Sequence, residues 1–203
     1  MKKYALIVAG GSGKRMQNST PKQFLLLKNK PILMHTLQQF SDFTKIILVL
    51  PGSQITYWKE LCKEFEFNLK HTITEGGENR FYSVKNGLKL IPNDSIVAIH
   101  DGVRPFISRS TINNLLTELK NGIGVIPVIP LKESIRKQKG EFSIALDRTH
   151  IYKVQTPQCF ISAEIKAAYE NKYQTKYTDD ASVFESYKGK IMQLLGEEKN
   201  IKT

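Results

Sequence analysis

Short apolar runs recur along this chain, and segments with helical spacing of apolar residues separate them. Four of these runs have the length of buried strands, namely Tyr4–Val8, Lys45–Leu50, Ser95–Ile99 and Gly124–Val128. Continuous apolar strands with no polar alternation are typical of a sheet covered by helices on both faces. The chain is therefore predicted to have an α/β fold with a mostly parallel, twisted sheet.

The segments between these runs complete the predicted order of elements. Pro31 suits the first turn of a helix because its φ is fixed, and helical spacing follows at Ile32, Leu33, Thr36, Leu37 and Phe40. Further helices are expected over Ile55–Phe65, Phe81–Ile91 and Ser110–Leu119, with another strand over Asn68–Ile73. A chain of 203 residues suits one domain.

The segment from Lys132 to Val154 departs from this alternation. Lys139-Gly140 forms a turn between two alternating stretches, which indicates a β-hairpin. A lone hairpin with weakly apolar alternation needs a surface to pack on. We expect residues 132–154 to form an arm that pairs with a second subunit, giving a homodimer; the alternative is a solvated loop.

Composition excludes several classes of protein. The aliphatic stretch Ile46–Leu50 is far shorter than the roughly 20 residues of a membrane span, and the N-terminus lacks a signal-peptide pattern, so a cytoplasmic protein with no membrane partner is expected. Cys62 and Cys159 have no metal-binding spacing and are expected to be reduced packing residues.

The net charge of +11 favours an anionic partner such as a phosphorylated small molecule. Zinc-finger spacing, RNP-type aromatic motifs and lysine blocks are absent from the sequence. Nucleic acid is therefore not expected as a partner. A non-catalytic basic module that binds nucleic acid stays open as a less favoured alternative.

The first apolar run ends in a glycine-rich loop, LIVAGGSGKRM, at residues 6–16. A Walker A loop would require glycine at position 8 and Ser or Thr at position 15, which are Val8 and Arg15 here. A dinucleotide fingerprint would require a third glycine where Met16 stands. Both phosphate-binding loops are therefore excluded.

The remaining pattern, Gly-Gly-x-Gly-x-Arg-Met followed by Pro21-Lys22-Gln23, resembles the signature loop of sugar-nucleotide-type nucleotidyltransferases. Four more stretches agree in order: GGENRFYSV from Gly76, HDGVRPF from His100, TPQCF from Thr156 and YTDDAS from Tyr177. Together they resemble the 2-C-methyl-D-erythritol 4-phosphate cytidylyltransferase family over nearly the whole chain. The resemblance implies a Rossmann-like nucleotidyltransferase fold and transfer of CMP from CTP to methylerythritol phosphate in non-mevalonate isoprenoid biosynthesis. Ribitol-5-phosphate cytidylyltransferase is the runner-up.

The resemblance also implies roles for individual residues. Arg15 and Lys22 are the expected catalytic residues, because cations stabilise the crowded charge of a phosphoryl-type transition state. CTP would be bound by Ala9, Gly10, Gly11, Gly13, Gly77, Glu78, Arg80, Ser83, Asp101 and Gly102. The sugar phosphate would be bound by Arg104, Ser134, Arg148, Thr156, Thr178 and Lys202.

Four of these residues have a more specific expected role. Asp101 ends an apolar strand, where an oxygen ligand would orient Mg²⁺. Gly102 is expected to leave room for the ribose, and the Ser83 hydroxyl is expected to distinguish cytosine from uracil. Thr178 is expected to line the substrate pocket, or to cap a helix that starts at Asp179.

The chain departs from the family pattern in three places. Gly10 and Gly102 stand where some members carry alanine, and the family usually continues beyond the position of Thr203. Lys202 matches the family lysine that contacts the substrate phosphate, and it lies one residue from the end of this sequence.

Overall fold

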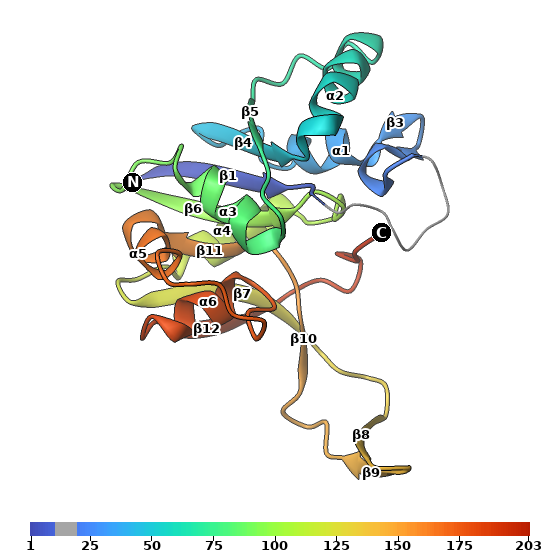
Figure 1. Cartoon of the computed structure of the whole chain (residues 1–203), viewed down its shortest axis with the longest axis vertical. Coiled ribbons are helices and arrows are strands. Elements are labelled where there is room, and N and C mark those ends of the chain that lie inside the picture. The colour runs from blue at the N-terminus through green and yellow to red at the C-terminus, as the bar shows by residue number, and fades with distance from the viewer. Residues whose placement is uncertain (11–19) are drawn as a thin grey trace.

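The structure is a computed structural model, and it describes residues 1–10 and 20–203. Its centre is a mixed sheet of eight strands (Figure 1). The strands are β1 (Lys2–Val8), β4 (Lys45–Leu50), β5 (Thr72–Glu75), β6 (Ser95–Asp101), β7 (Ile123–Pro130), β10 (Tyr152–Val154), β11 (Gln158–Ile161) and β12 (Lys190–Leu195).

β1 lies in the middle of the sheet, with β4 on one side and β6 on the other, both parallel to it. β5 extends the parallel part beyond β4. β11 is antiparallel to β6 and to β7, so it is inserted between two strands of the same direction. Because Val128 pairs with both Leu195 of β12 and Val154 of β10, β12 and β10 lie on opposite edges of β7.

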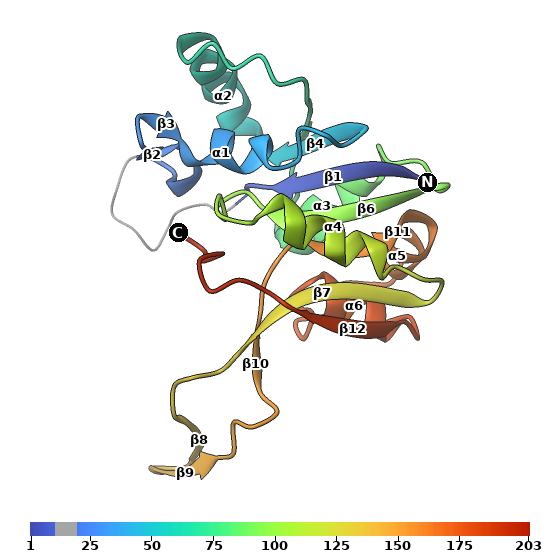
Figure 2. The same cartoon turned by 180° about the vertical axis from the view of Figure 1, so that it is seen from behind.

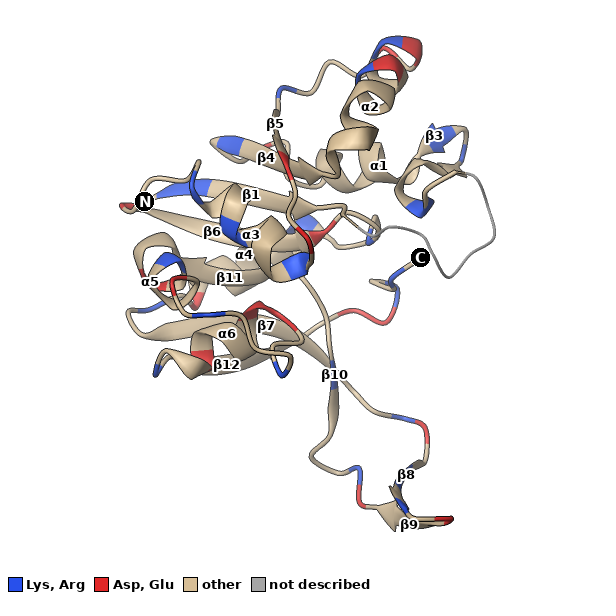
Figure 3. Cartoon of the chain, viewed as in Figure 1, with Lys and Arg blue, Asp and Glu red and all other residues tan. Residues whose placement is uncertain are grey.

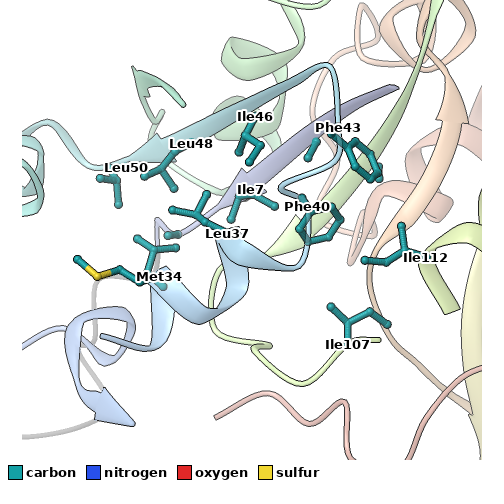
Figure 4. Packing of buried hydrophobic residues seen from close by; sticks show 14 of the residues in the cluster. Ile7, Met34, Leu37, Phe40, Phe43, Ile46, Leu48, Leu50, Ile107 and Ile112 are labelled. Atoms are coloured by element: carbon teal, nitrogen blue, oxygen red, sulfur yellow. The ribbon is translucent and has the colours of Figure 1, made fainter. Parts of the chain in front are cut away.

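The helices cover both faces of this sheet, as the apolar runs predicted. Ala5 and Ile7 of β1 face the cluster of α1 (Ile32–Gln38), α2 (Gly52–Glu64) and α4 (Arg109–Thr117). Tyr4, Leu6 and Val8 face α3 (Arg80–Leu88), α5 (Ser162–Ala168) and α6 (Asp180–Ser186). Figure 4 shows part of the first cluster, and Figure 2 shows α1 and α4 on the side of the sheet opposite to α3, α5 and α6.

The predicted elements are all present, but several bounds were wrong. α2 begins at Gly52, directly after its N-cap Pro51, and not at Ile55. The strand expected over residues 68–73 is β5 at Thr72–Glu75, because β4 pairs with these residues through Ile47–Leu50. The structure adds elements that we did not expect: the 3₁₀ helix η1 (Lys22–Phe24), the small ladder of β2 (Leu26–Leu27) and β3 (Lys30–Pro31), and α5, β11 and β12.

The hairpin predicted within residues 132–154 is formed by β8 (Ile135–Lys139) and β9 (Phe142–Leu146), with Gly140 at positive φ in the turn. It projects from the body of the molecule (Figure 1). Tyr152–Val154 do not belong to the projecting part, because as β10 they pair with β7 of the central sheet.

Lys and Arg are interspersed with Asp and Glu on α2 and on the arm (Figure 3). Both cysteines are free, and burial raises the pKa of the Cys62 thiol to about 11, so it stays protonated near neutral pH. Across the described residues, the helices all fall short of the length and apolarity needed to cross a membrane.

Candidate active site

The candidate site lies where β1 and β6 end side by side. Val8 and Asp101 are partners in the parallel ladder, and the Gly102 N–H donates to the Val8 carbonyl oxygen at 2.9 Å. The glycine loop after β1 therefore starts next to the Asp101-Gly102 turn. Gly11, Gly13 and Arg15 lie outside the described residues, so the structure describes this loop only at its start, Ala9-Gly10, and after residue 19.

The Gln23 side chain connects the segment that follows the glycine loop to the end of β1. Its Nε2 donates to the Ala9 carbonyl oxygen at 3.0 Å and to Gln54 Oε1 of α2 at 2.6 Å, and the side chain is 2% exposed. Phe24 is buried against Trp58 at a centroid separation of 6.1 Å. These two anchors fix η1, so Lys22 is held beside the carboxyl end of β1.

Three cations converge on the buried carboxylate of Asp101. Arg104 Nε and Lys202 Nζ both lie 3.2 Å from Oδ2, and Arg80 Nε lies 3.6 Å from Oδ1. Burial favours the neutral acid, but the three positive charges outweigh it and hold the pKa of Asp101 well below its usual range. Asp101 is therefore an anion at neutral pH, within a cluster of net positive charge.

A chain of buried hydrogen bonds holds the Asp101 turn in place. His100 Nε2 donates to the Arg104 carbonyl oxygen at 3.0 Å, so Nδ1 of the neutral ring accepts from the Thr156 hydroxyl at 2.9 Å. The same hydroxyl oxygen accepts from the Asp101 N–H at 3.1 Å. Burial lowers the pKa of His100 to about 4, so the ring is neutral at pH 7.

This network gives Thr156 a different task from the one expected. Its hydroxyl was expected to face the sugar alcohol, yet it is 5% exposed and both of its hydrogen bonds go to the Asp101 turn. The Thr156 carbonyl oxygen accepts from Asn200 Nδ2 at 2.9 Å. Thr156 therefore joins the end of β6 to the C-terminal segment.

The C-terminal segment is ordered by contacts with the same turn. The N–H and hydroxyl of Thr203 both donate to the Val103 carbonyl oxygen, at 3.0 and 2.9 Å. Arg104 Nη1 donates to the carbonyl oxygen of the buried Asn200 at 2.8 Å. These bonds on either side of Lys202 explain how a residue next to the chain end reaches Asp101.

Ser83 shapes the loop that was expected to bind the base. Its Oγ accepts from the Gly77 N–H at 3.1 Å and donates to the Asn79 carbonyl oxygen at 2.9 Å. Asn79 caps α3 through the Tyr82 N–H, while Gly77 and Glu78 are exposed. The Ser83 hydroxyl proton is therefore engaged within the loop. Gly77 and Glu78 are left as the exposed residues through which this loop can contact a ligand.

Arg80, the first residue of α3, forms a two-pronged pair with Asp180 of α6. Its Nη1 and Nη2 donate to the two carboxylate oxygens at 2.8 and 2.7 Å. Although burial acts against the charge, Asp180 and Asp101 raise the pKa of Arg80. Asp180, which sequence reasoning missed, therefore belongs to the same charged cluster as Asp101.

Local geometry bears on two of the expected roles. A Cβ on Gly102 would lie 2.8 Å from Ala9 Cβ and 3.1 Å from Leu33 Cδ1, so the missing side chain leaves room for these two neighbours, and the contact of Gly102 with a ribose stays a prediction. The N-cap of α6 is Asp179 and not Thr178, and the helix begins at Asp180, because Asp179 accepts from the Ser182 N–H in a capping box. Thr178 is exposed just before the cap.

Ser134 and Arg148 are the two expected substrate residues that lie apart from this cluster within the chain. Both are exposed on the projecting arm (Figure 1). Arg148 Nη1 donates to the Lys132 carbonyl oxygen, which joins the two sides of the arm at its base. The described site therefore combines residues of β1, η1, α3, β6, α6 and the C-terminal segment.

Comparison with known proteins places this geometry in a family. Residues 4–203 match the family model of 2-C-methyl-D-erythritol 4-phosphate cytidylyltransferase. The chain is 46% identical over 201 residues to the enzyme of that name from Bacteroides fragilis, covering 98% of this chain and 92% of that protein. It is 45% identical over 205 residues to the one from Porphyromonas gingivalis, covering 99% and 91%.

Solved structures agree in fold. The Francisella tularensis 2-C-methyl-D-erythritol 4-phosphate cytidylyltransferase superposes with a TM-score of 0.81 at 29% identity, covering 100% of this chain and 94% of that one. The Thermus thermophilus enzyme of the same name superposes with a TM-score of 0.80 at 25% identity, covering 100% and 92%. With the match running from Tyr4 to Thr203, the chain belongs to the 2-C-methyl-D-erythritol 4-phosphate cytidylyltransferase family.

Proposed function

We propose that this enzyme transfers CMP from CTP to 2-C-methyl-D-erythritol 4-phosphate. A phosphate oxygen of the sugar alcohol attacks the α-phosphorus of CTP, a new P–O–P linkage forms, and the bond to the β-phosphate breaks with release of pyrophosphate. The products are 4-diphosphocytidyl-2-C-methyl-D-erythritol and pyrophosphate. Family membership supports this reaction and its place in isoprenoid biosynthesis.

One observation carries the assignment to this site: Arg80, Arg104 and Lys202 surround Asp101 at the strand end beside Ala9-Gly10, where the glycine loop starts. Both substrates are anionic phosphates, and the transition state gathers their charge at one phosphorus. Catalysis of such a transfer depends mainly on positioning and on cations that stabilise this charge.

Each cationic side chain of the site, including Lys22 and Arg15, has a proposed phosphate or nucleotide partner. Lys22, held by the Gln23 anchor, contacts the α-phosphate, together with Arg15 of the glycine loop. Arg104 and Lys202 hold the phosphate of the attacking sugar alcohol, and Lys202 is 58% exposed on its side chain, which leaves it able to turn toward a ligand. Arg80 and the exposed Gly77 and Glu78 face the nucleotide.

A divalent cation, Mg²⁺, fits Asp101 only with the help of the substrate. Among the described residues, His, Cys, Asp and Glu side chains form no group of three or more able to hold a metal. Mg²⁺ is commonly bound by one or two carboxylates together with substrate phosphates, and Asp101 supplies one anionic carboxylate. Bound there, Mg²⁺ would neutralise triphosphate charge, while the nearby cations would transfer from Asp101 to the phosphates.

The arm supports a homodimer. Phe142, Ile144 and Leu146 alternate along β9 and lie on one face of the hairpin, and they are 80%, 50% and 42% exposed. A second copy of the chain would cover this apolar face. We propose that Ser134 and Arg148 then reach the partner's site and hold the sugar phosphate.

The dimer proposal is tested by subunit mixing. Arg148→Ala is expected to raise KM for the sugar phosphate far more than KM for CTP. Mixed dimers of Arg148→Ala and Lys22→Ala subunits should regain activity, because one of the two shared sites would contain both native residues. A monomer in sedimentation, or inactive mixed dimers, would show that each subunit works alone.

The substrate is tested by pyrophosphate release from CTP with either acceptor. Methylerythritol 4-phosphate is expected to support faster release than ribitol 5-phosphate at equal concentration. Faster release with ribitol 5-phosphate would favour the runner-up activity. Release with neither acceptor would refute both.

A further inference from the structure

Asp180 is a fully buried carboxylate that the transfer reaction does not use directly. It accepts two hydrogen bonds from Arg80 and a third from the Tyr169 hydroxyl at 2.6 Å. A buried charge is strongly unfavourable unless it is paired and hydrogen-bonded, and these hydrogen bonds meet that need here.

Arg80 lies between two carboxylates and is bound by one of them. Both Nη atoms lie within 2.8 Å of Asp180, whereas its contact with Asp101 is a single Nε at 3.6 Å. A planar guanidinium gains most from a two-pronged carboxylate. Asp180 therefore fixes both the position and the orientation of Arg80.

Aromatic packing supports the same arrangement. Tyr169, which donates to Asp180, is 1% exposed and stacks on Phe81 at 4.7 Å. Phe81 follows Arg80 on α3, so the start of α3 is held by a hydrogen bond on one side and by ring packing on the other.

Asp180 also joins two parts of the proposed site. It is the first residue of α6, whose N-cap Asp179 accepts from Gln158 Nε2 at 2.8 Å, while the Ala181 N–H donates to Gln158 Oε1 at 2.7 Å. The exposed Thr178, a proposed substrate contact, precedes this anchored start. The Arg80–Asp180 pair thus connects the nucleotide loop to the substrate wall.

We propose that Asp180 is a positioning residue that engages both Nη atoms of Arg80, limits the contact of Arg80 with Asp101 to a single Nε, and so keeps the Asp101 carboxylate available to the cation that accompanies CTP. The proposal rests on the proposed function, which assigns that cation to Asp101. Without the Asp180 charge, Arg80 would turn its Nη atoms to Asp101 and oppose a divalent cation there, since the two positive charges would compete for one carboxylate.

The test compares the CTP affinity with and without Mg²⁺, measured by calorimetry in the absence of acceptor. The ratio of the two dissociation constants reports how strongly Mg²⁺ and CTP assist each other, and a general loss of affinity changes both constants equally. For Asp180→Asn, this ratio is expected to fall about tenfold below that of the native protein. Tyr169→Phe removes one hydrogen bond and leaves the charge, so it is expected to keep most of the ratio.

The double variant Arg80→Gln/Asp180→Asn separates positioning from fold stability. It removes both charges, so no guanidinium is released toward Asp101, and the Mg²⁺ ratio should return toward the native value even if CTP binds more weakly. A purely structural role for Asp180 predicts a ratio unchanged in Asp180→Asn, or lowered alike in the single and double variants; either result overturns the proposal.

The measurement also distinguishes this proposal from the reaction itself. It needs no acceptor and no turnover, so an enzyme inactive with methylerythritol phosphate would refute the function while leaving the ratio measurable. If the dissociation constant of CTP for the native protein is the same with and without Mg²⁺, the role proposed for Asp180 is overturned.

Discussion

The buried hydroxyl of Thr156 offers a sharp test of how the Asp101 turn is held. Replacing Thr156 with valine keeps the volume and shape of the side chain but removes the oxygen. The Asp101 N–H and His100 Nδ1 then lose their partner, at 3.1 and 2.9 Å respectively, inside a buried region. The variant therefore measures the hydrogen bonds with little contribution from a cavity.

The expected loss follows from these two groups. An unsatisfied buried donor or acceptor costs about 1–3 kcal/mol, so Thr156→Val should lower the free energy of unfolding by about 2–5 kcal/mol after partial relaxation. Thr156→Ser keeps the hydroxyl and loses one methyl group, so it should cost only about 1 kcal/mol. Urea unfolding at pH 7 measures both values, and Thr178→Val is the matched control at an exposed threonine.

Kinetics separate this role from a direct substrate contact. If the hydroxyl holds the Asp101 turn, Thr156→Val should lower kcat because Asp101 and Arg104 shift together. If the hydroxyl binds the sugar alcohol, KM for methylerythritol phosphate should rise while stability stays within about 0.5 kcal/mol of the native value, the range of an ordinary surface change. The second pattern would refute our interpretation of the network.

Three further outcomes are expected. Lys22→Ala should lower kcat about a hundredfold with little change in unfolding free energy, because Lys22 acts on transition-state charge; near-normal turnover in a steady-state assay would exclude that role. Ser83→Ala should reduce the preference for CTP over UTP by loosening the Gly77–Asn79 loop that Ser83 holds, and an unchanged ratio of kcat/KM values would contradict this. His71 accepts from the Trp58 indole N–H at 2.9 Å, and burial lowers its pKa despite the hydrogen bond with the Leu69 carbonyl oxygen. The unfolded chain then takes up the proton more readily, so stability should decrease as pH falls below about 6.5. The fluorescence of Trp58, the single tryptophan, can follow unfolding at pH 7 and pH 5, and His71→Gln should show a smaller decrease.

The sequence by itself determined the class of the fold and the chemistry of the site. Tyr4–Val8, Lys45–Leu50 and Ser95–Ile99 are apolar on both faces because helices cover both sides of the sheet, and this pattern is visible within a few residues of chain. The order of the motifs likewise indicated the family, and the alternation around Lys139-Gly140 predicted the hairpin. These signals are local, so a linear reading can detect them.

The tertiary structure alone decided which residues meet. Arg80 pairs with Asp180 across 100 residues of chain, and Thr203 is bound to Val103 across another 100. Local patterns contain no information on such distant partners, because these contacts depend on the order of the strands and on the insertion of β11 between β6 and β7. Only the tertiary structure shows why residue 102 lacks a side chain. Ala9 at the end of β1 packs against the turn after β6, and a Cβ on Gly102 would need the space that Ala9 occupies, although the two residues are far apart in the sequence.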